Sequence, residues 1–178
     1  MTVMLTGKGA AHESASARGV VFLHSCPRAL SPHLEWALAS VFGTEVHIDW
    51  ADQPISPGSV RAEIIWTAAA GTGARLASAL LAFTQVRYEV TEDAAPGRDG
   101  ERFAATPSLG LFRATIGPFG DVMVHEERLR TAISHAQVTG ESMVDEVARL
   151  IGTPWDDELE PFRSAHEGST VRLMHQVV

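Results

Sequence analysis

The stretch that decides the fold is residues 19–43, GVVFLHSCPRALSPHLEWALASVFG. Its first six residues are apolar and rich in β-branched side chains, which is typical of a strand buried on both faces of a sheet. Ser31 before Pro32 then provides an N-cap and a favoured first helical residue, and apolar residues recur at helical spacing until Gly43. The stretch therefore predicts a central strand followed by an amphipathic helix.

The next part of the chain continues with strands and a second helix. Polar and apolar residues alternate over residues 45–50 and again over residues 60–66, which indicates two half-solvated strands. Residues 71–73, Gly-Thr-Gly, open a helix with apolar residues at helical spacing, and residues 86–90 form a further strand. The predicted order is βαββαβ.

An internal similarity supports this order. Residues 44–50 match residues 84–90 in polarity, position by position, and each segment follows an amphipathic helix. Two similar βαβ halves with right-handed crossovers predict a ferredoxin-like sandwich, in which two helices cover one face of an antiparallel sheet. The fold class is therefore expected to be α+β.

We expect three parts in the chain: a flexible N-terminal arm (1–17), the βαββαβ core (18–94) and a C-terminal part (95–178) packed on that core. A connector rich in Pro, Gly and charge, residues 91–102, joins the last two. The C-terminal part is predicted to contain a β-hairpin with strands at 109–116 and 121–125, then helices, then a closing strand at 171–178.

The composition excludes several classes of protein. The chain has 178 residues, ordinary globular composition and a formal net charge of −8, so disorder and repeat architectures are excluded and binding of nucleic acid or anionic lipid is disfavoured. The single cysteine, Cys26, excludes an internal disulfide and predicts a reducing, cytoplasmic location. No apolar run reaches signal-peptide or membrane-spanning length, so we expect neither export nor a membrane anchor.

Four strings resemble those of an uncharacterised actinobacterial family, domain of unknown function 3145: RGVVFLHSCPRALSPH (18–33), GTGARLASAL (71–80), GERF (100–103) and LGLF (109–112). The resemblance extends over nearly the whole chain. It implies a cytosolic protein encoded beside genes of dissociated fatty-acid synthesis. It implies no activity and no catalytic residue.

Two of these strings contain the candidate binding residues. We expect the loops after the first and third strands to meet at one edge of the sheet, where each begins a helix whose free amides attract an anion. The ligand-binding candidates are Ser25, Arg28, Thr72, Gly73 and Arg75. They predict a pocket for a phosphate or carboxylate, although the glycines match neither a Walker A motif nor a dinucleotide fingerprint, and the alternative is ordinary turn chemistry with solvated arginines.

The only catalytic candidates are Cys26 and His24. A thiol near a helix start and beside Arg28 is a candidate nucleophile, but without an identified base we favour a small buried hydrophobe, and no catalytic residue is expected. A zinc motif that starts at His125 is absent because residue 129 is leucine, so we expect no metal and no cofactor.

Two classes of function follow from these observations. The favoured class is a noncatalytic cytosolic binding or regulatory protein that recognises an anionic metabolite or a protein partner in fatty-acid or acyl metabolism. The alternative is a small enzyme that acts on a phosphate- or carboxylate-bearing substrate through the edge that holds Cys26 and Gly73. Exposed edge strands in such folds also allow a homodimer.

Overall fold

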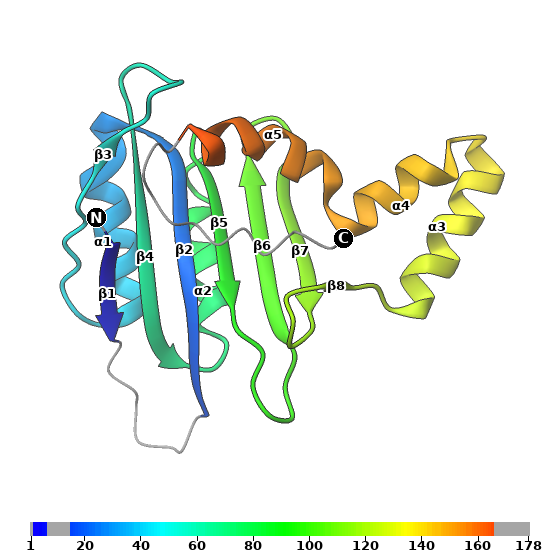
Figure 1. The fold of residues 1–178 in the computed structure, drawn as a ribbon, viewed down its shortest axis with the longest axis horizontal. Helices are drawn as coiled ribbons and strands as arrows, with labels where there is room; N and C mark the ends of the chain where they lie inside the picture. The colour runs from blue at the N-terminus through cyan, green and yellow to red at the C-terminus, as the bar shows by residue number, and fades with distance from the viewer. Residues whose placement is uncertain (1, 7–14, 166–178) are drawn as a thin grey trace.

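A computed structural model describes residues 2–6 and 15–165, and these residues form an eight-stranded sheet with helices on both faces (Figure 1). The strands are β1 (Thr2–Thr6), β2 (Ser16–Pro27), β3 (Ala51–Asp52), β4 (Ser59–Ala69), β5 (Arg87–Glu92), β6 (Gly100–Thr106), β7 (Gly110–Ile116) and β8 (Val122–Met123). The helices are the 3₁₀ helix η1 (Arg28–Leu30) and the α-helices α1 (Ser31–Phe42), α2 (Thr72–Leu80), α3 (Glu126–Thr139), α4 (Met143–Ile151) and α5 (Thr153–Ser164). The α+β class is confirmed, but the sheet has twice the expected four strands.

The sheet has the order β1-β4-β2-β5-β6-β7-β8, with β3 paired beside β1 on the outer edge of β4. All paired strands are antiparallel except β1 and β4. Helices α1 and α2 cover one face, where Leu34, Leu38 and Leu76 pack with Ile64 and Trp66 of β4 in the main core. The predicted helix stop at residue 43 is confirmed, because Gly43 ends α1 with a φ of 68°.

The strand predicted at residues 45–50 is wrong. This segment has no strand structure. Directly after it, the two residues of β3 form a short pairing with β4. Extension of the β3 register would place residues 45–49 opposite residues 63–67, but β1 already pairs with residues 63–67. The expectation of an N-terminal arm is corrected for residues 2–6 for the same reason, since they form β1.

The connector predicted at residues 91–102 contains the end of one strand and the start of another. Strand β5 extends to Glu92, β6 begins at Gly100, and the two strands pair. The expected boundary near residue 95 therefore falls within one continuous sheet. The predicted β-hairpin is confirmed, because β7 pairs with β8.

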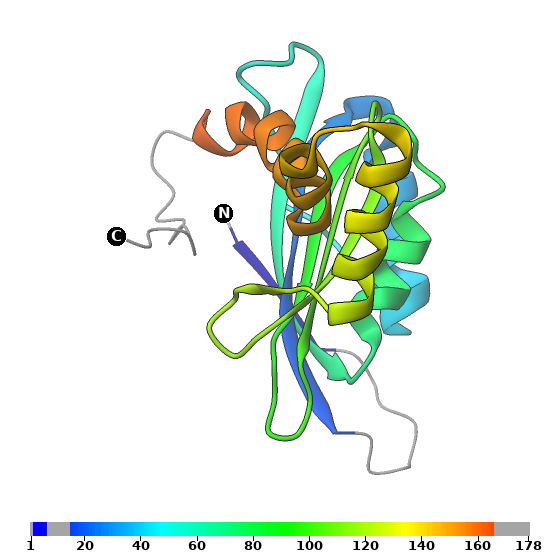
Figure 2. The ribbon, with the colours of Figure 1, turned by 90° about the vertical axis from the view of Figure 1, so that its right-hand side faces the viewer.

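Helix α5 lies on the opposite face of the sheet from α1 and α2 (Figure 2). It buries Leu159 against three side chains of β6 and β7, namely Ala104, Phe112 and Ala114. This second core is much smaller than the first, and only Leu159 is fully buried on α5. The closing strand predicted at residues 171–178 lies outside the described residues.

Helices α3 and α4 form a helical hairpin that projects beyond the β7 edge of the sheet (Figure 1). We call α3 and α4 together the helical hairpin. Gly152 joins it to α5: this residue follows α4 directly, precedes α5, and has a φ of 92°. A Cβ atom at Gly152 would lie 2.7 Å from the Phe112 ring, so both the backbone and the space require glycine. In residues 2–6 and 15–165, no helix is both long and apolar enough to cross a membrane.

Candidate functional site

The two loops predicted to share a pocket lie at opposite ends of the sheet. Cys26 on β2 pairs with Val60 at the start of β4, whereas Ser16 pairs with Ala69 at the end of β4, just before α2. At about 3.3 Å per strand residue, the β2 and β4 exits are separated by roughly 30 Å. The shared pocket is therefore wrong, because antiparallel neighbours direct their carboxyl ends to opposite edges. The proposed enzyme edge that joined Cys26 to Gly73 is wrong for the same reason.

Three of the predicted binding side chains, those of Arg28, Thr72 and Arg75, have partners within the chain. Arg28 forms an exposed ion pair with Asp52, and Ser25 is buried. At the other end of the sheet, the Thr72 hydroxyl donates to the Ala69 carbonyl at 2.7 Å. Arg75 donates to a carbonyl at the end of α1. These contacts fit the alternative of turn chemistry.

The anion at the start of α2 is a side chain of the protein. The Glu92 carboxylate of β5 accepts hydrogen bonds from the Gly71 and Gly73 amides, both at 2.8 Å. It also pairs with Arg98, and the Glu92 side chain is only 1% exposed. The sequence predicted that an anionic ligand would bind here, but the anion at this helix start is the side chain of Glu92, a residue in the expected connector.

Cys26 is fully buried in the core, and its thiol donates to the Pro27 carbonyl at 3.2 Å. Burial raises the pKa of the Cys26 thiol to about 11. The group is therefore a neutral thiol near pH 7, which is a poor nucleophile. This environment fits the expectation of a small buried hydrophobe.

A buried cluster of charges lies between the sheet and α5. We define the Glu89 cluster as Glu89 of β5, His24 of β2, Arg102 of β6, and Asp156 and Arg163 of α5. The Glu89 carboxylate accepts from His24 Nε2 at 2.7 Å, from Arg102 at 2.8 Å and from Arg163 at 2.7 Å and 2.9 Å. Both arginines also pair with Asp156. Three strands and a helix distant in sequence therefore meet at one carboxylate.

The electrostatics of the Glu89 cluster favour ionised groups. Burial by itself would raise the pKa of Glu89, but the hydrogen bonds and charges of His24 and Arg163 outweigh it and hold that pKa well below its usual range. Burial would lower the pKa of Arg163, but Glu89 and Asp156 raise it further above neutrality. The buried acids and bases compensate one another, so the cluster attaches α5 to the sheet.

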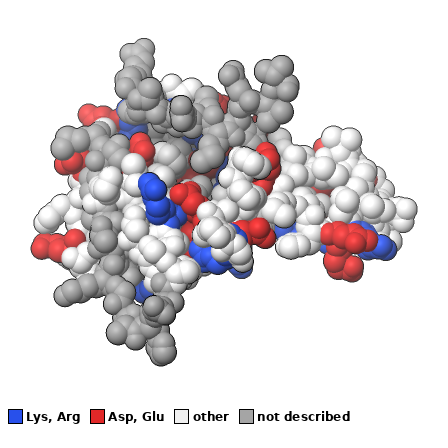
Figure 3. All heavy atoms as spheres, turned by 60° about the horizontal axis from the view of Figure 1, so that its bottom comes forward, with Lys and Arg blue, Asp and Glu red and all other residues white. Residues whose placement is uncertain are grey.

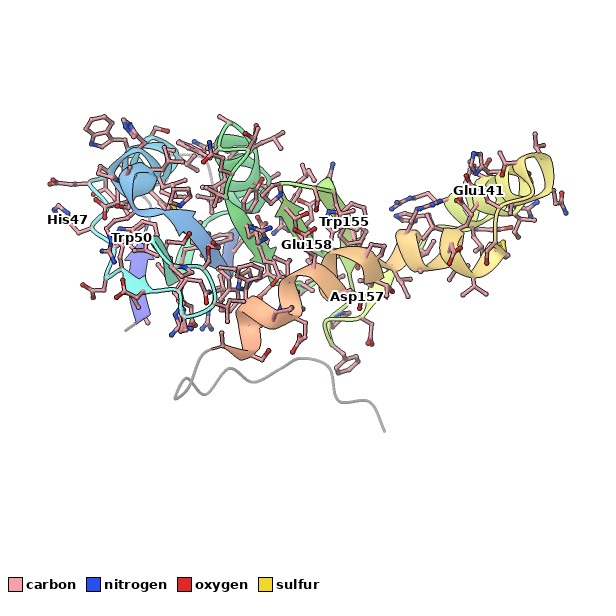
Figure 4. The ribbon with its side chains drawn as sticks, turned by 90° about the horizontal axis from the view of Figure 1, so that it is seen from above. His47, Trp50, Glu141, Trp155, Asp157 and Glu158 are labelled. Carbon is pink, nitrogen blue, oxygen red and sulfur yellow. The ribbon has the colours of Figure 1, made fainter. Side chains whose placement is uncertain are left out.

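Further polar contacts fix the same helix. Glu158 of α5 pairs with Arg87 of β5 at 3.2 Å and accepts from Thr106 at 2.9 Å. Figure 4 shows Trp155 and Glu158 directed towards the sheet and Asp157 directed away from it. The indole of Trp155 donates to the Gly110 carbonyl at 3.0 Å. The sequence pattern of α5 does not reveal which face of the helix packs on the sheet.

Three residues at the turn of the helical hairpin have the side chains of metal ligands. The ligand atoms of His135, Glu141 and Glu146 all lie within 4.8 Å of one another. However, Arg149 already pairs with both carboxylates, at 3.0 Å and 2.7 Å. The guanidinium of Arg149 lies where a metal cation would bind the two carboxylates. We therefore interpret these residues as an ion-pair cluster that joins α3 to α4.

Most of the exposed large hydrophobic side chains lie in one stretch of the chain, residues 109–151. Thirteen large hydrophobic residues are exposed in the described chain, and nine of them lie in residues 109–151. We call these nine residues the apolar surface: Leu109, Leu111, Phe119, Met123, Leu129, Ile133, Val138, Val144 and Ile151. In Figure 3 the projecting part of the molecule is mostly white, with acidic and basic side chains beside one another near its end. Five of the nine lie on the helical hairpin, and contiguous exposed apolar patches are typical of interaction sites.

The fold and these surfaces define a class of protein, an α+β domain with a projecting helical hairpin. Its buried charged side chains form ion pairs with one another, and several large apolar side chains are exposed on the hairpin. A family model described as "Protein of unknown function (DUF3145)" matches residues 20–176, so the chain belongs to that family. Comparisons with curated proteins and with solved structures found no match.

Proposed function

We propose that the protein is a noncatalytic protein-binding domain and that the apolar surface on and beside the helical hairpin is its binding surface. One observation carries this proposal: nine of the thirteen exposed large hydrophobics in the described residues lie in residues 109–151, and five of these nine are on the helical hairpin. Residues such as Phe119, at 88% exposure, and Val144, at 75%, gain free energy when a partner removes them from water.

The candidate chemical groups favour binding over catalysis. The thiol of Cys26 is buried and neutral, and the start of α2 is filled by Glu92. The side chains of the Glu89 cluster bond to one another. A partner from fatty-acid or acyl metabolism stays a prediction from the family resemblance.

A photo-crosslinking experiment in the native cell tests the proposal. A photoreactive amino acid placed at Val144 or Phe119 is expected to give a discrete protein adduct that an Ile133→Glu substitution removes. The matched control is Trp36, which is 69% exposed on α1, far from the helical hairpin, and is expected to give none. Absence of adducts at both surface positions, or the same adduct from Trp36, would contradict the proposal.

We also infer that β2 to β5 form a ferredoxin-like core within the larger sheet. The spatial order β3-β4-β2-β5, with each neighbouring pair antiparallel and with α1 and α2 on one face, supports this inference. On this interpretation β6 to β8, α5 and the helical hairpin are additions to the core.

A further inference from the structure

We propose that α5 is a lid on one face of the sheet, and that it opens together with the helical hairpin while the sheet and the main core stay folded. In its closed position α5 lies on the face opposite α1 and α2 (Figure 2) and bonds to Glu89 of β5 through Arg163. Opening uncovers Glu89 and moves the helical hairpin relative to the sheet. This inference goes beyond the proposed function, because it holds whatever binds the hairpin.

Apolar packing holds α5 less firmly than it holds the helices of the main core. Leu159 is the one buried side chain of α5, in a second core of only four buried residues. Helix α1 also has 12 residues, but it buries three large side chains in the main core, Leu34, Leu38 and Phe42. Because stabilisation by packing is roughly proportional to the apolar area removed from water, α5 is the more easily detached of the two helices.

Charged side chains supply much of the remaining attachment. Asp156 of α5 pairs with Arg102 of β6, and Arg163 of α5 pairs with Glu89 of β5. Opening returns these groups to water, where they regain their hydration, and this gain offsets much of the lost attraction between the charges. The ion pairs therefore fix the position of the closed lid without making its opening as costly as unfolding the main core.

The order of elements lets the lid leave without breaking the sheet. Helices α3, α4 and α5 all follow β8, and no strand of the described residues comes after them. Outside itself, the helical hairpin has its main contacts with α5 and not with a strand. Residues 126–165 are therefore joined to the sheet by residues 124–125 and by the contacts of α5, so they can move as one part.

Opening has two measurable consequences. Helix α5 has 12 residues and contains Pro161, and isolated helices of about this length are marginal in water. The amides of a detached α5 therefore lose their hydrogen bonds and exchange with solvent. In addition, Ala104 of β6, which is fully buried against Leu159, becomes accessible from solvent.

Thiol labelling of the full chain in native buffer tests the inference. Ala104→Cys under α5 and Ala77→Cys in the main core are matched single-cysteine variants, since each alanine is at most 1% exposed. Both carry Cys26→Ala, and circular dichroism verifies that they are folded. The thiol at residue 104 should react about tenfold faster or more than the thiol at residue 77. Adding Glu89→Gln should accelerate labelling at residue 104 by roughly tenfold or more. Adding Ile64→Val, which perturbs only the main core, should accelerate labelling at residue 77 by roughly two- to tenfold and leave residue 104 unchanged.

Hydrogen exchange of the wild-type chain is a second measurement that needs no substitution. The amides of α5 should exchange faster than those of α2, and their exchange should depend less on urea, because a local opening exposes less surface than global unfolding. Equal labelling at residues 104 and 77, or α5 amides that exchange only by global unfolding, would overturn the inference. So would an Ile64→Val substitution that accelerates labelling equally at both positions, or a Glu89→Gln substitution without effect at residue 104.

Discussion

Glu89 and Glu92 lie three residues apart on β5, and each attaches a helix to a different face of the same sheet. Glu92 bonds two backbone amides at the start of α2, a helix that also buries Leu76, Ala77 and Leu80 in the main core. Glu89 bonds only side chains, from β2, β6 and α5, and α5 fully buries only Leu159. The comparison indicates that apolar packing dominates the attachment of α2, whereas charge contributes a much larger share to the attachment of α5.

The largest expected effect comes from removal of the Glu89 carboxylate. Glu89→Ala leaves His24, Arg102 and Arg163 without their common acceptor, and loss of one partner of a buried ion pair costs about 3–5 kcal/mol. Urea unfolding should show this decrease in the free energy of unfolding. Glu160→Ala is the matched control, since Glu160 is a half-exposed partner of the same Arg163 at 3.5 Å, and it should cost less than about 1 kcal/mol. Equal losses in the two variants would mean that the cluster does not stabilise the attachment of α5.

A smaller effect is expected on the other face of the sheet. Glu92→Gln keeps the size of the side chain but removes the charge and one of the two acceptor oxygens, so a buried amide at the start of α2 loses its partner at a cost of about 1–3 kcal/mol. Urea unfolding measures the loss, and Glu101→Gln, at a residue that pairs with the exposed Arg113, is the control. A Glu92→Gln variant that is less stable than Glu89→Ala would mean that charge contributes more to the attachment of α2 than to that of α5.

The pH dependence of the free energy of unfolding also tests the role of the Glu89 carboxylate. Because the folded-state pKa of Glu89 is held below that of the unfolded chain, about 4.3, its contribution to stability is present above that pH and is lost as the pH falls. The difference in free energy of unfolding between wild type and Glu89→Gln should therefore narrow from pH 6 towards pH 3. A constant difference over this range would show that the carboxylate is not preferentially ionised in the folded protein.

The smallest expected effect tests the contact between Gly73 and Glu92. A Cβ atom at residue 73 would lie 3.0 Å from both Cβ and Oε2 of Glu92, whereas alanine gains up to about 1 kcal/mol over glycine in helix propensity. Gly73→Ala should therefore destabilise the wild type slightly, by less than about 1 kcal/mol, and should cost less in the Glu92→Ala variant, which keeps Cβ but lacks Oε2. A double-mutant cycle from urea unfolding measures this coupling, and additive effects would exclude the contact with Oε2.

Local sequence patterns predicted the elements whose structure depends on neighbouring residues. The apolar run before Cys26 and the Gly43 stop specify their own backbone, and β2 and α1 follow them. The prediction of Ser31 as N-cap is wrong, because Ser31 is the first residue of α1 and follows η1, and Leu30 takes the N-cap position without a side-chain hydrogen bond. The prediction of a strand at residues 45–50 was wrong because another segment, β1, pairs with β4. Alternation of polar and apolar residues does not reveal which of two segments pairs with a given strand. Strand β6 was missed because its small Ala104 and Ala105 give no apolar alternation.

The candidate site was harder to predict than the fold. The preference of the α2 start for an anion follows from its own residues, but the source of that anion, Glu92, depends on the register between β5 and the rest of the sheet. Directly bonded residues of the Glu89 cluster lie up to 74 positions apart. Its members are ordinary charged residues in the sequence, and only the tertiary fold distinguishes them from solvated ones.

Gly152 sets the direction of the helical hairpin relative to the sheet. This residue is the C-cap of α4 and the N-cap of α5, and its left-handed backbone leaves no room for a Cβ atom beside the Phe112 ring. A Cβ atom there would meet the Phe112 ring, so a substitution requires either that ring to move or α4 to change its direction relative to α5. The conformation of this one residue therefore sets the direction in which the helical hairpin leaves the sheet.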